Sequence, residues 1–217
     1  MNPEPSKESP MSNTVELYYN PMSRATITHW MLEEAEADFV LKMIDFTKDE
    51  NNTEAFLKLN PMGKLPTIVH RGAVVTEAAA ICAYIADQFP KNELAPALNS
   101  PERGAYYRWL FFGAGCVEPA TLDKALDRGN PDKASSVGYG SYERTFDTLE
   151  LVLRERSFLV GEQFTAADVY MASQLDLGMI FKTIDTRPVF SQYVARCQDR
   201  PGYKRCAATH SRLMAKA

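Results

Sequence analysis

Three short segments in the N-terminal part of the chain carry residue types that can bind and activate a thiol compound. In the first, the apolar run 14–19 leads into 20–25 (NPMSRA), so Ser23 stands where a strand gives way to a helix. A helix N-terminus offers free N–H groups and a partial positive charge, which stabilise anions and lower the pKa of a thiol. A serine hydroxyl placed there can donate a hydrogen bond to a thiolate. Capping the helix is the commoner role of such a serine, so Ser23 by itself leaves both roles open.

The second segment, 60–69 (NPMGKLPTIV), places Pro66 at the mouth of a strand. Proline has no N–H to donate, so it belongs at a strand start or edge. A cis Leu65–Pro66 bond would leave the main chain of Leu65 free to pair with an extended peptide, whereas a trans proline would merely start the strand. Lys64 and Arg24 are candidate partners for ligand carboxylates, with solvated surface charge as the alternative.

The third segment, 75–80 (VTEAAA), places an acid at another helix start. Glu77 is either a first-turn acid that complements the helix dipole or an acceptor for a ligand ammonium group. Thr76 is the expected N-cap of that helix.

The order of elements indicates two different halves. Up to about residue 90 the apolar spacing predicts the order βαβαββα, with strands at 14–19, 39–46, 67–70 and 73–75 and helices at 23–37, 53–59 and 77–89. A polar linker follows at 91–100. Beyond it the spacing predicts only helices, at about 101–128, 137–156, 165–181, 188–199 and 201–215. We therefore expect an α/β domain followed by an all-helical one.

Bulk composition excludes several classes of protein. Of 217 residues, 45% are hydrophobic and 24% charged, the net charge is −4 and the pI is about 5.5, which argues against binding nucleic acid by phosphate neutralisation. No apolar run approaches the roughly 18 residues of a membrane span. The polar N-terminus reads as a flexible tail over 1–12 and not as a secretory signal. Four cysteines without CxxC or zinc spacing favour a cytoplasmic protein without a metal site.

The three segments resemble those of the cytosolic glutathione S-transferases, in a bacterial-like form with a serine in the active loop. The resemblance runs from about Val15 to about Arg212. It implies a thioredoxin-like, glutathione-binding domain at 13–90, a linker at 91–100, and a helical domain with the electrophile site at 101–217. It also implies a homodimer.

The resemblance assigns roles to individual residues. Ser23 would stabilise the glutathione thiolate, with Tyr18 as the second choice. Leu65 would pair with the cysteinyl backbone through its main chain, and Pro66 would be the cis proline. The remaining glutathione contacts would come from Glu77 to the γ-glutamyl ammonium, from Lys64 to the glycyl carboxylate, and from the N–H of Ala78, where many members have serine.

The helix that starts near residue 101 is apolar on more than one side. Arg108, Trp109 and Phe112 are possible residues of an electrophile site, with core packing or a dimer contact as the alternatives. Arg108 would pair either with an acidic substrate or with a surface carboxylate. In the helical half, 165–168 (TAAD) predicts a structural capping box.

The expected function is therefore detoxifying transfer of glutathione, as co-substrate, to a small apolar electrophile. Two alternatives remain open at this point. One is a non-catalytic protein that binds glutathione or apolar ligands. The other is a glutathione-dependent isomerase, lyase or peroxidase on the same fold.

Overall fold

The computed structural model describes residues 13–128 and 131–215, so the expected tail at 1–12 lies outside the described residues. Four strands form one mixed sheet in the order β2-β1-β3-β4. The strands are β1 (Val15–Tyr19), β2 (Phe39–Met43), β3 (Thr67–His70) and β4 (Ala73–Thr76). β1 runs parallel to β2 and antiparallel to β3, and β3 pairs antiparallel with β4.

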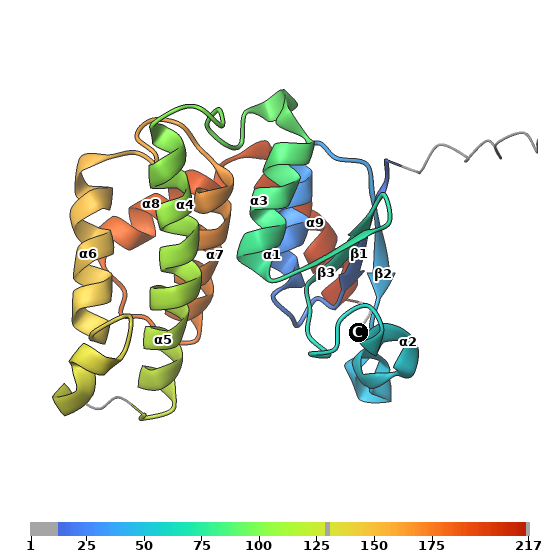
Figure 1. Cartoon of the computed structure of the whole chain (residues 1–217), viewed down its shortest axis with the longest axis horizontal. Helices are drawn as coiled ribbons and strands as arrows, with labels where there is room; N and C mark the ends of the chain where they lie inside the picture. The colour runs from blue at the N-terminus through green and yellow to red at the C-terminus, as the bar shows by residue number, and fades with distance from the viewer. Residues whose placement is uncertain (1–12, 129–130, 216–217) are drawn as a thin grey trace, which may run out of the picture.

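Alternation along β1 decides which face of the sheet is buried. Val15, Leu17 and Tyr19 are fully buried, whereas Glu16 and Tyr18 point to the opposite, partly exposed face. The helices of this half are α1 (Ala25–Glu34), α2 (Glu54–Leu57) and α3 (Ala78–Gln88). α1 and α3 lie between the sheet and the second half of the molecule (Figure 1). The predicted βαβαββα order is confirmed.

One predicted strand is shorter in the structure. The strand expected over 39–46 ends at Met43, because the Asp45 carboxylate accepts a hydrogen bond from the N–H of Thr47 and caps a 3₁₀ turn. Such local side-chain bonds compete with the sheet for the backbone.

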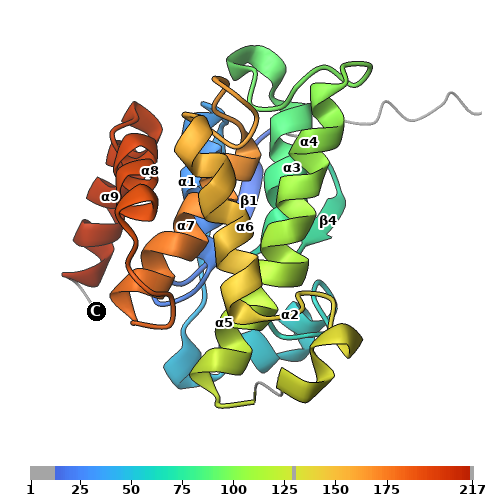
Figure 2. The same cartoon turned by 90° about the vertical axis from the view of Figure 1, so that its left-hand side faces the viewer.

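The second half is all-helical, as predicted. Its helices are α4 (Glu102–Phe112), α5 (Glu118–Ala125), α6 (Tyr142–Glu155), α7 (Ala166–Ile180), α8 (Pro188–Gln198) and α9 (Pro201–Met214). α7 is buried along most of its length and packs against both halves, with α8 and α9 on one side of it and α4 on the other (Figure 2).

A π-helical turn, Gly113–Val117, interrupts the helix that the sequence predicted as continuous over 101–128. A Cβ at Gly113 would lie 2.7 Å from the Tyr170 ring, so the close packing of α7 here depends on glycine. A π turn adds a residue to the helix and changes which side chains of the following turns share a face.

The Glu34 side chain links α1 to the start of α9. Its carboxylate accepts hydrogen bonds from Trp30 Nε1 and from Arg200 Nε, each at 2.9 Å. A Cβ at Gly202 would lie 2.6 Å from Glu34 Cδ, so only glycine lets α9 start this close to α1. The two halves are therefore held by buried polar contacts as well as by apolar packing.

The predicted capping box at the start of α7 is present and fully buried. The Asp168 carboxylate accepts hydrogen bonds from the main-chain N–H of Thr165 (2.9 Å) and of Leu159 (2.8 Å), and from the hydroxyl of Tyr193 (2.9 Å). Burial raises the pKa of Asp168 to about 6, against the opposing effect of these donors. One side chain thus joins α7, the preceding loop and α8.

Candidate active site

Two adjoining chambers lie where the halves meet. The first, of about 670 Å³, is lined from the sheet half by Lys64, Leu65, Pro66, Glu77 and Ala78. The second, of about 440 Å³, is lined by Ser23 and by apolar side chains of the first loop, α5 and α7. Arg24, Glu118 and Leu122 line both chambers. The structure therefore brings all three predicted segments to one cleft.

Ser23 lies two residues before α1 and is half-buried. Its hydroxyl donates to the Asn20 carbonyl at 2.7 Å and accepts from the N–H of Ala25 at 3.2 Å. The Asn20 carbonyl also accepts from the main-chain N–H of Ser23 at 3.1 Å. The serine thus makes the local contacts of a helix-start residue while its hydroxyl lines the cleft.

The Leu65–Pro66 peptide is cis, as the resemblance implies. Buried Asn60 holds the preceding loop, because its side-chain amide donates to the Lys64 carbonyl at 2.9 Å. Within the described residues, no hydrogen bond is made by the main-chain N–H or C=O of Leu65. The edge that would pair with a peptide backbone is therefore free.

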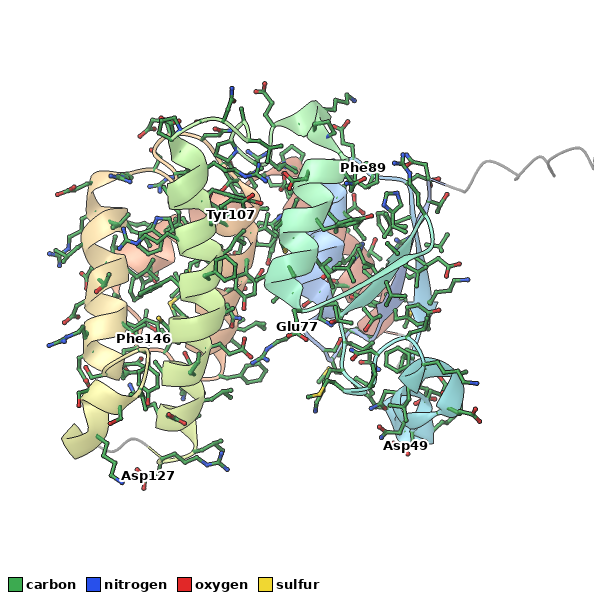
Figure 3. All side chains as sticks on the ribbon, viewed as in Figure 1. Asp49, Glu77, Phe89, Tyr107, Asp127 and Phe146 are labelled. Carbon is green, nitrogen blue, oxygen red and sulfur yellow. The ribbon has the colours of Figure 1, made fainter. Side chains whose placement is uncertain are left out.

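Glu77 is the N-cap residue of α3, which corrects the prediction of Thr76, the last residue of β4. Its backbone has φ 67° and ψ 115°, a conformation that residues other than glycine rarely adopt. Glu77 is exposed at the end of α3 that faces the helical half (Figure 3), and within the described residues no cation pairs with it. Strained positions of this kind cluster at functional sites.

A chain of polar contacts crosses the cleft between its two chambers. Arg24 forms an ion pair with Glu118 at the start of α5. Glu118 also accepts from the Tyr170 hydroxyl at 3.3 Å, and that hydroxyl accepts from the Gln174 amide at 3.0 Å. Sequence reasoning missed Glu118 and Tyr170, and the only local signal was the proline after Glu118, which marks a helix start.

The predicted electrophile-site residues do not line either chamber. Trp109 is 1% exposed in the core, and Phe112 packs edge-to-face on it with ring centroids 5.3 Å apart. The Arg108 guanidinium is exposed and lies over the Trp109 ring at 4.4 Å. Trp109 and Phe112 therefore pack toward the core, while Arg108 lies on the surface above Trp109.

Tyr18, the second choice for activating a thiol, points away from the cleft. It packs edge-to-face on Phe56 on the opposite side of the sheet. Burial and the neighbouring Glu16 carboxylate raise the pKa of Tyr18, so it is a poor proton donor. Of the two candidate hydroxyls, that of Ser23 lines the cleft and that of Tyr18 does not.

Two further properties concern the described part of the chain. None of its helices is long and apolar enough to cross a membrane. Residues 13–128 and 131–215 contain no group of three or more His, Cys, Asp or Glu arranged to hold a metal ion.

Comparisons with known proteins agree with this geometry. Residues 13–87 match the family model described as glutathione S-transferase, N-terminal domain, and residues 139–201 match the corresponding C-terminal domain. The glutathione S-transferase stcT of Emericella nidulans is 30% identical over 162 residues, which cover 71% of this chain and 72% of that protein. The chain belongs to the glutathione S-transferase family.

Solved glutathione transferases share the whole fold. The enzyme of Methylococcus capsulatus superposes with a TM-score of 0.74 at 28% identity, over 91% of this chain and 98% of its own. A sphingomonad glutathione S-transferase, solved in complex with glutathione, gives 0.74 at 27% identity, over 90% of this chain and 98% of its own. These superpositions cover both halves of this glutathione S-transferase, between which the cleft lies.

Proposed function

We propose that this chain transfers glutathione to a small apolar electrophile, with Ser23 stabilising the thiolate. The observation that carries the proposal is that Ser23, the free main-chain edge of Leu65 and the carboxylate of Glu77 border one cleft. Membership of the glutathione S-transferase family and the glutathione complex of the sphingomonad relative support it.

Ser23 can redirect its hydroxyl at small cost. A thiolate beside α1 would take the hydrogen bond now donated to the Asn20 carbonyl. That carbonyl would keep the bond from the main-chain N–H of Ser23, so no buried acceptor would be left unpaired. The hydroxyl and the helix N-terminus together would favour the ionised sulfur, which is the nucleophile.

The first chamber suits an extended, charged tripeptide. The cysteinyl backbone would pair with Leu65, the γ-glutamyl ammonium would lie beside Glu77, and the glycyl carboxylate would meet Lys64. The N–H of Ala78 at the start of α3 would meet the γ-glutamyl carboxylate, since helix N-termini bind anions. These assignments use groups that border one cavity.

The second chamber suits an apolar acceptor. Met22 and Phe181 line it and are 72% and 70% exposed, which are large exposed fractions for apolar side chains. We place the electrophile there, within 101–217 and the first loop, and assign glutathione binding to 13–90 with 91–100 as the linker. The proposal includes a cytoplasmic homodimer, on family resemblance.

The proposal is tested by the ultraviolet absorbance of the glutathione thiolate, titrated against pH with the protein in excess. Free thiol ionises near pH 8.5, and we expect the bound thiol to ionise at least one unit lower. S-methylglutathione, which has no ionisable thiol, is the control for absorbance changes of the protein. Binding with an unshifted thiol would contradict the thiolate role, and no binding would contradict the proposed function.

Glu77 offers a separate prediction about binding. Glu77→Gly should raise the KM for glutathione about 10–100-fold, because a hydrogen bond to a charged group is lost. The same change should leave the free energy of unfolding equal or up to about 1 kcal/mol higher, because glycine adopts the positive φ without strain.

Glu77→Gln is the matched variant, because it removes the charge and keeps the strained backbone. It should raise KM without the gain in stability. Steady-state kinetics at varied glutathione concentration and urea denaturation measure the two effects. An unchanged KM in both variants would remove Glu77 from the glutathione site.

A further inference from the structure

A third cavity, of about 350 Å³, lies between α1, α7 and α9. It adjoins the apolar chamber, with which it shares Thr26, Leu177 and His210. Its size falls in the range of small-ligand sites. Neither the glutathione contacts nor the thiolate chemistry proposed above uses it.

One carboxylate dominates the charge of this cavity. Asp176 of α7 is half-buried there, and no lysine or arginine of residues 13–128 and 131–215 lines the cavity. Within the described residues Asp176 forms no ion pair, and its recorded side-chain hydrogen bond is with Gln198. Burial raises the pKa of Asp176, which is the response of a carboxylate that lacks a cationic partner.

The nearby groups do not offset this charge. Burial raises the pKa of the Cys206 thiol to about 12, so that side chain is neutral at physiological pH. The Arg200 guanidinium is engaged elsewhere, because it bonds to Glu34 and lies over the Phe164 ring at 3.9 Å. His210 also lines the cavity, but within the described residues no ion pair joins it to Asp176. The Asp176 carboxylate therefore lines the cavity without a cationic partner among the described residues.

Two aromatic side chains, Trp30 and Tyr203, form part of the cavity wall. Trp30 and Tyr203 both line it and meet edge-to-face, with ring centroids 4.9 Å apart. The indole N–H of Trp30 donates to Glu34, so the indole cannot use that N–H on a ligand. No cation of the described chain lies over either ring, since the recorded cation–π contacts involve other aromatic side chains.

We propose that this cavity binds a small organic ammonium compound, with its cationic head beside Asp176 and its apolar body against Trp30 and Tyr203. A carboxylate beside aromatic faces attracts a poorly hydrated cation through both its charge and the ring quadrupoles. An anion such as glutathione is repelled from the same place. A neutral ligand would cover the carboxylate without supplying a partner, which is unfavourable.

Benzyltrimethylammonium is a suitable probe, titrated calorimetrically into the protein saturated with glutathione. Asp176→Asn should weaken its binding about tenfold, because the side chain keeps its shape and loses its charge. Glu155→Gln, a change of equal charge at the exposed end of α6, should leave the affinity unchanged. Equal binding by Asp176→Asn and wild type would overturn the proposal.

The nuclear magnetic resonance signals of the tryptophan indole N–H groups show where the probe binds. The chain has two tryptophans, Trp30 and Trp109, so two indole N–H signals are expected and Trp109→Phe assigns them. The Trp30 signal should shift on titration and the Trp109 signal should not. A loss of binding in Glu118→Gln with no Trp30 shift would place the cation in the cleft and overturn the proposal.

A comparison of probes on the wild type keeps the proposal testable if Asp176→Asn does not fold. Neopentylbenzene has the shape of benzyltrimethylammonium with carbon in place of the charged nitrogen. The cation should bind about tenfold more tightly than this neutral isostere. Equal affinities would show a merely apolar pocket and would contradict a role for Asp176.

Discussion

Replacing Ser23 with alanine is expected to lower kcat/KM about 100-fold, the usual effect of removing one donor to a developing or stabilised anion. Of the two candidate hydroxyls, Ser23 lines the cleft, whereas Tyr18 lies on the other face of the sheet. The affinity for glutathione should change little, because its charged ends would be held elsewhere. The pKa of the bound thiol should rise towards its free value of about 8.5.

Steady-state kinetics across pH separates this role from a structural one. In Ser23→Ala, kcat/KM should recover as the pH rises and the thiol ionises unaided, whereas a folding defect would lower it at every pH. Ser191→Ala, on the exposed surface of α8, is the matched control and should be active. Full turnover by Ser23→Ala at neutral pH would make the assignment wrong.

Asp168→Ala is expected to lower the free energy of unfolding by about 4 kcal/mol, enough to threaten a domain of ordinary stability. The change strips the acceptor from buried donors of Thr165, Leu159 and Tyr193. A lost cap alone costs about 1 kcal/mol, and each stranded buried donor adds to that. Urea denaturation at pH 7 measures the difference.

A surface carboxylate provides the comparison. Asp185 pairs with Lys124, and both side chains are exposed. Asp185→Ala should therefore lower the free energy of unfolding by less than about 1 kcal/mol. If Asp168→Ala also lowered the free energy of unfolding by less than about 1 kcal/mol, water would have to bond to the buried donors in its place.

The pKa of Asp168 gives the same experiment a pH dependence with a definite sign. The folded value, about 6, lies above the ordinary 3.8, so folding favours the protonated carboxyl. The additional stability that comes from protonating this carboxyl is complete below about pH 4 and is lost as the pH rises through about 6, whereas the hydrogen bonds accepted by the carboxylate remain. Wild type should therefore lose stability relative to Asp168→Asn across that window.

The sheet half of the site could be predicted because its signals are local. Ser23, Pro66 and Glu77 each stand at the junction of a strand and a helix or loop, where residue type and chain position specify the backbone. Even there, Thr76 was the wrong cap, because β4 continues through it and the chain turns at Glu77 with a positive φ. No propensity argument places glutamate in that conformation.

The helical half of the site could not be predicted in the same way. The sequence predicts one uninterrupted helix over 101–128, but the π turn breaks its period before Glu118 is reached. Glu118 reaches the cleft and pairs with Arg24, 94 positions away. A contact between residues so far apart in the sequence cannot be predicted from the residues that neighbour either of them.

The π turn at Gly113–Val117 also has a bearing on how members of this family diverge. Each residue added to or removed from a helix turns everything after it by about 100°. Losing one residue here would rotate Glu118 and Leu122 out of the cleft and bring a different row of α5 side chains into it, with no substitution among them. A change in chain length alone can thus change which side chains line the second chamber. In an alignment of relatives with and without this turn, matched positions of α5 would not be equivalent in space.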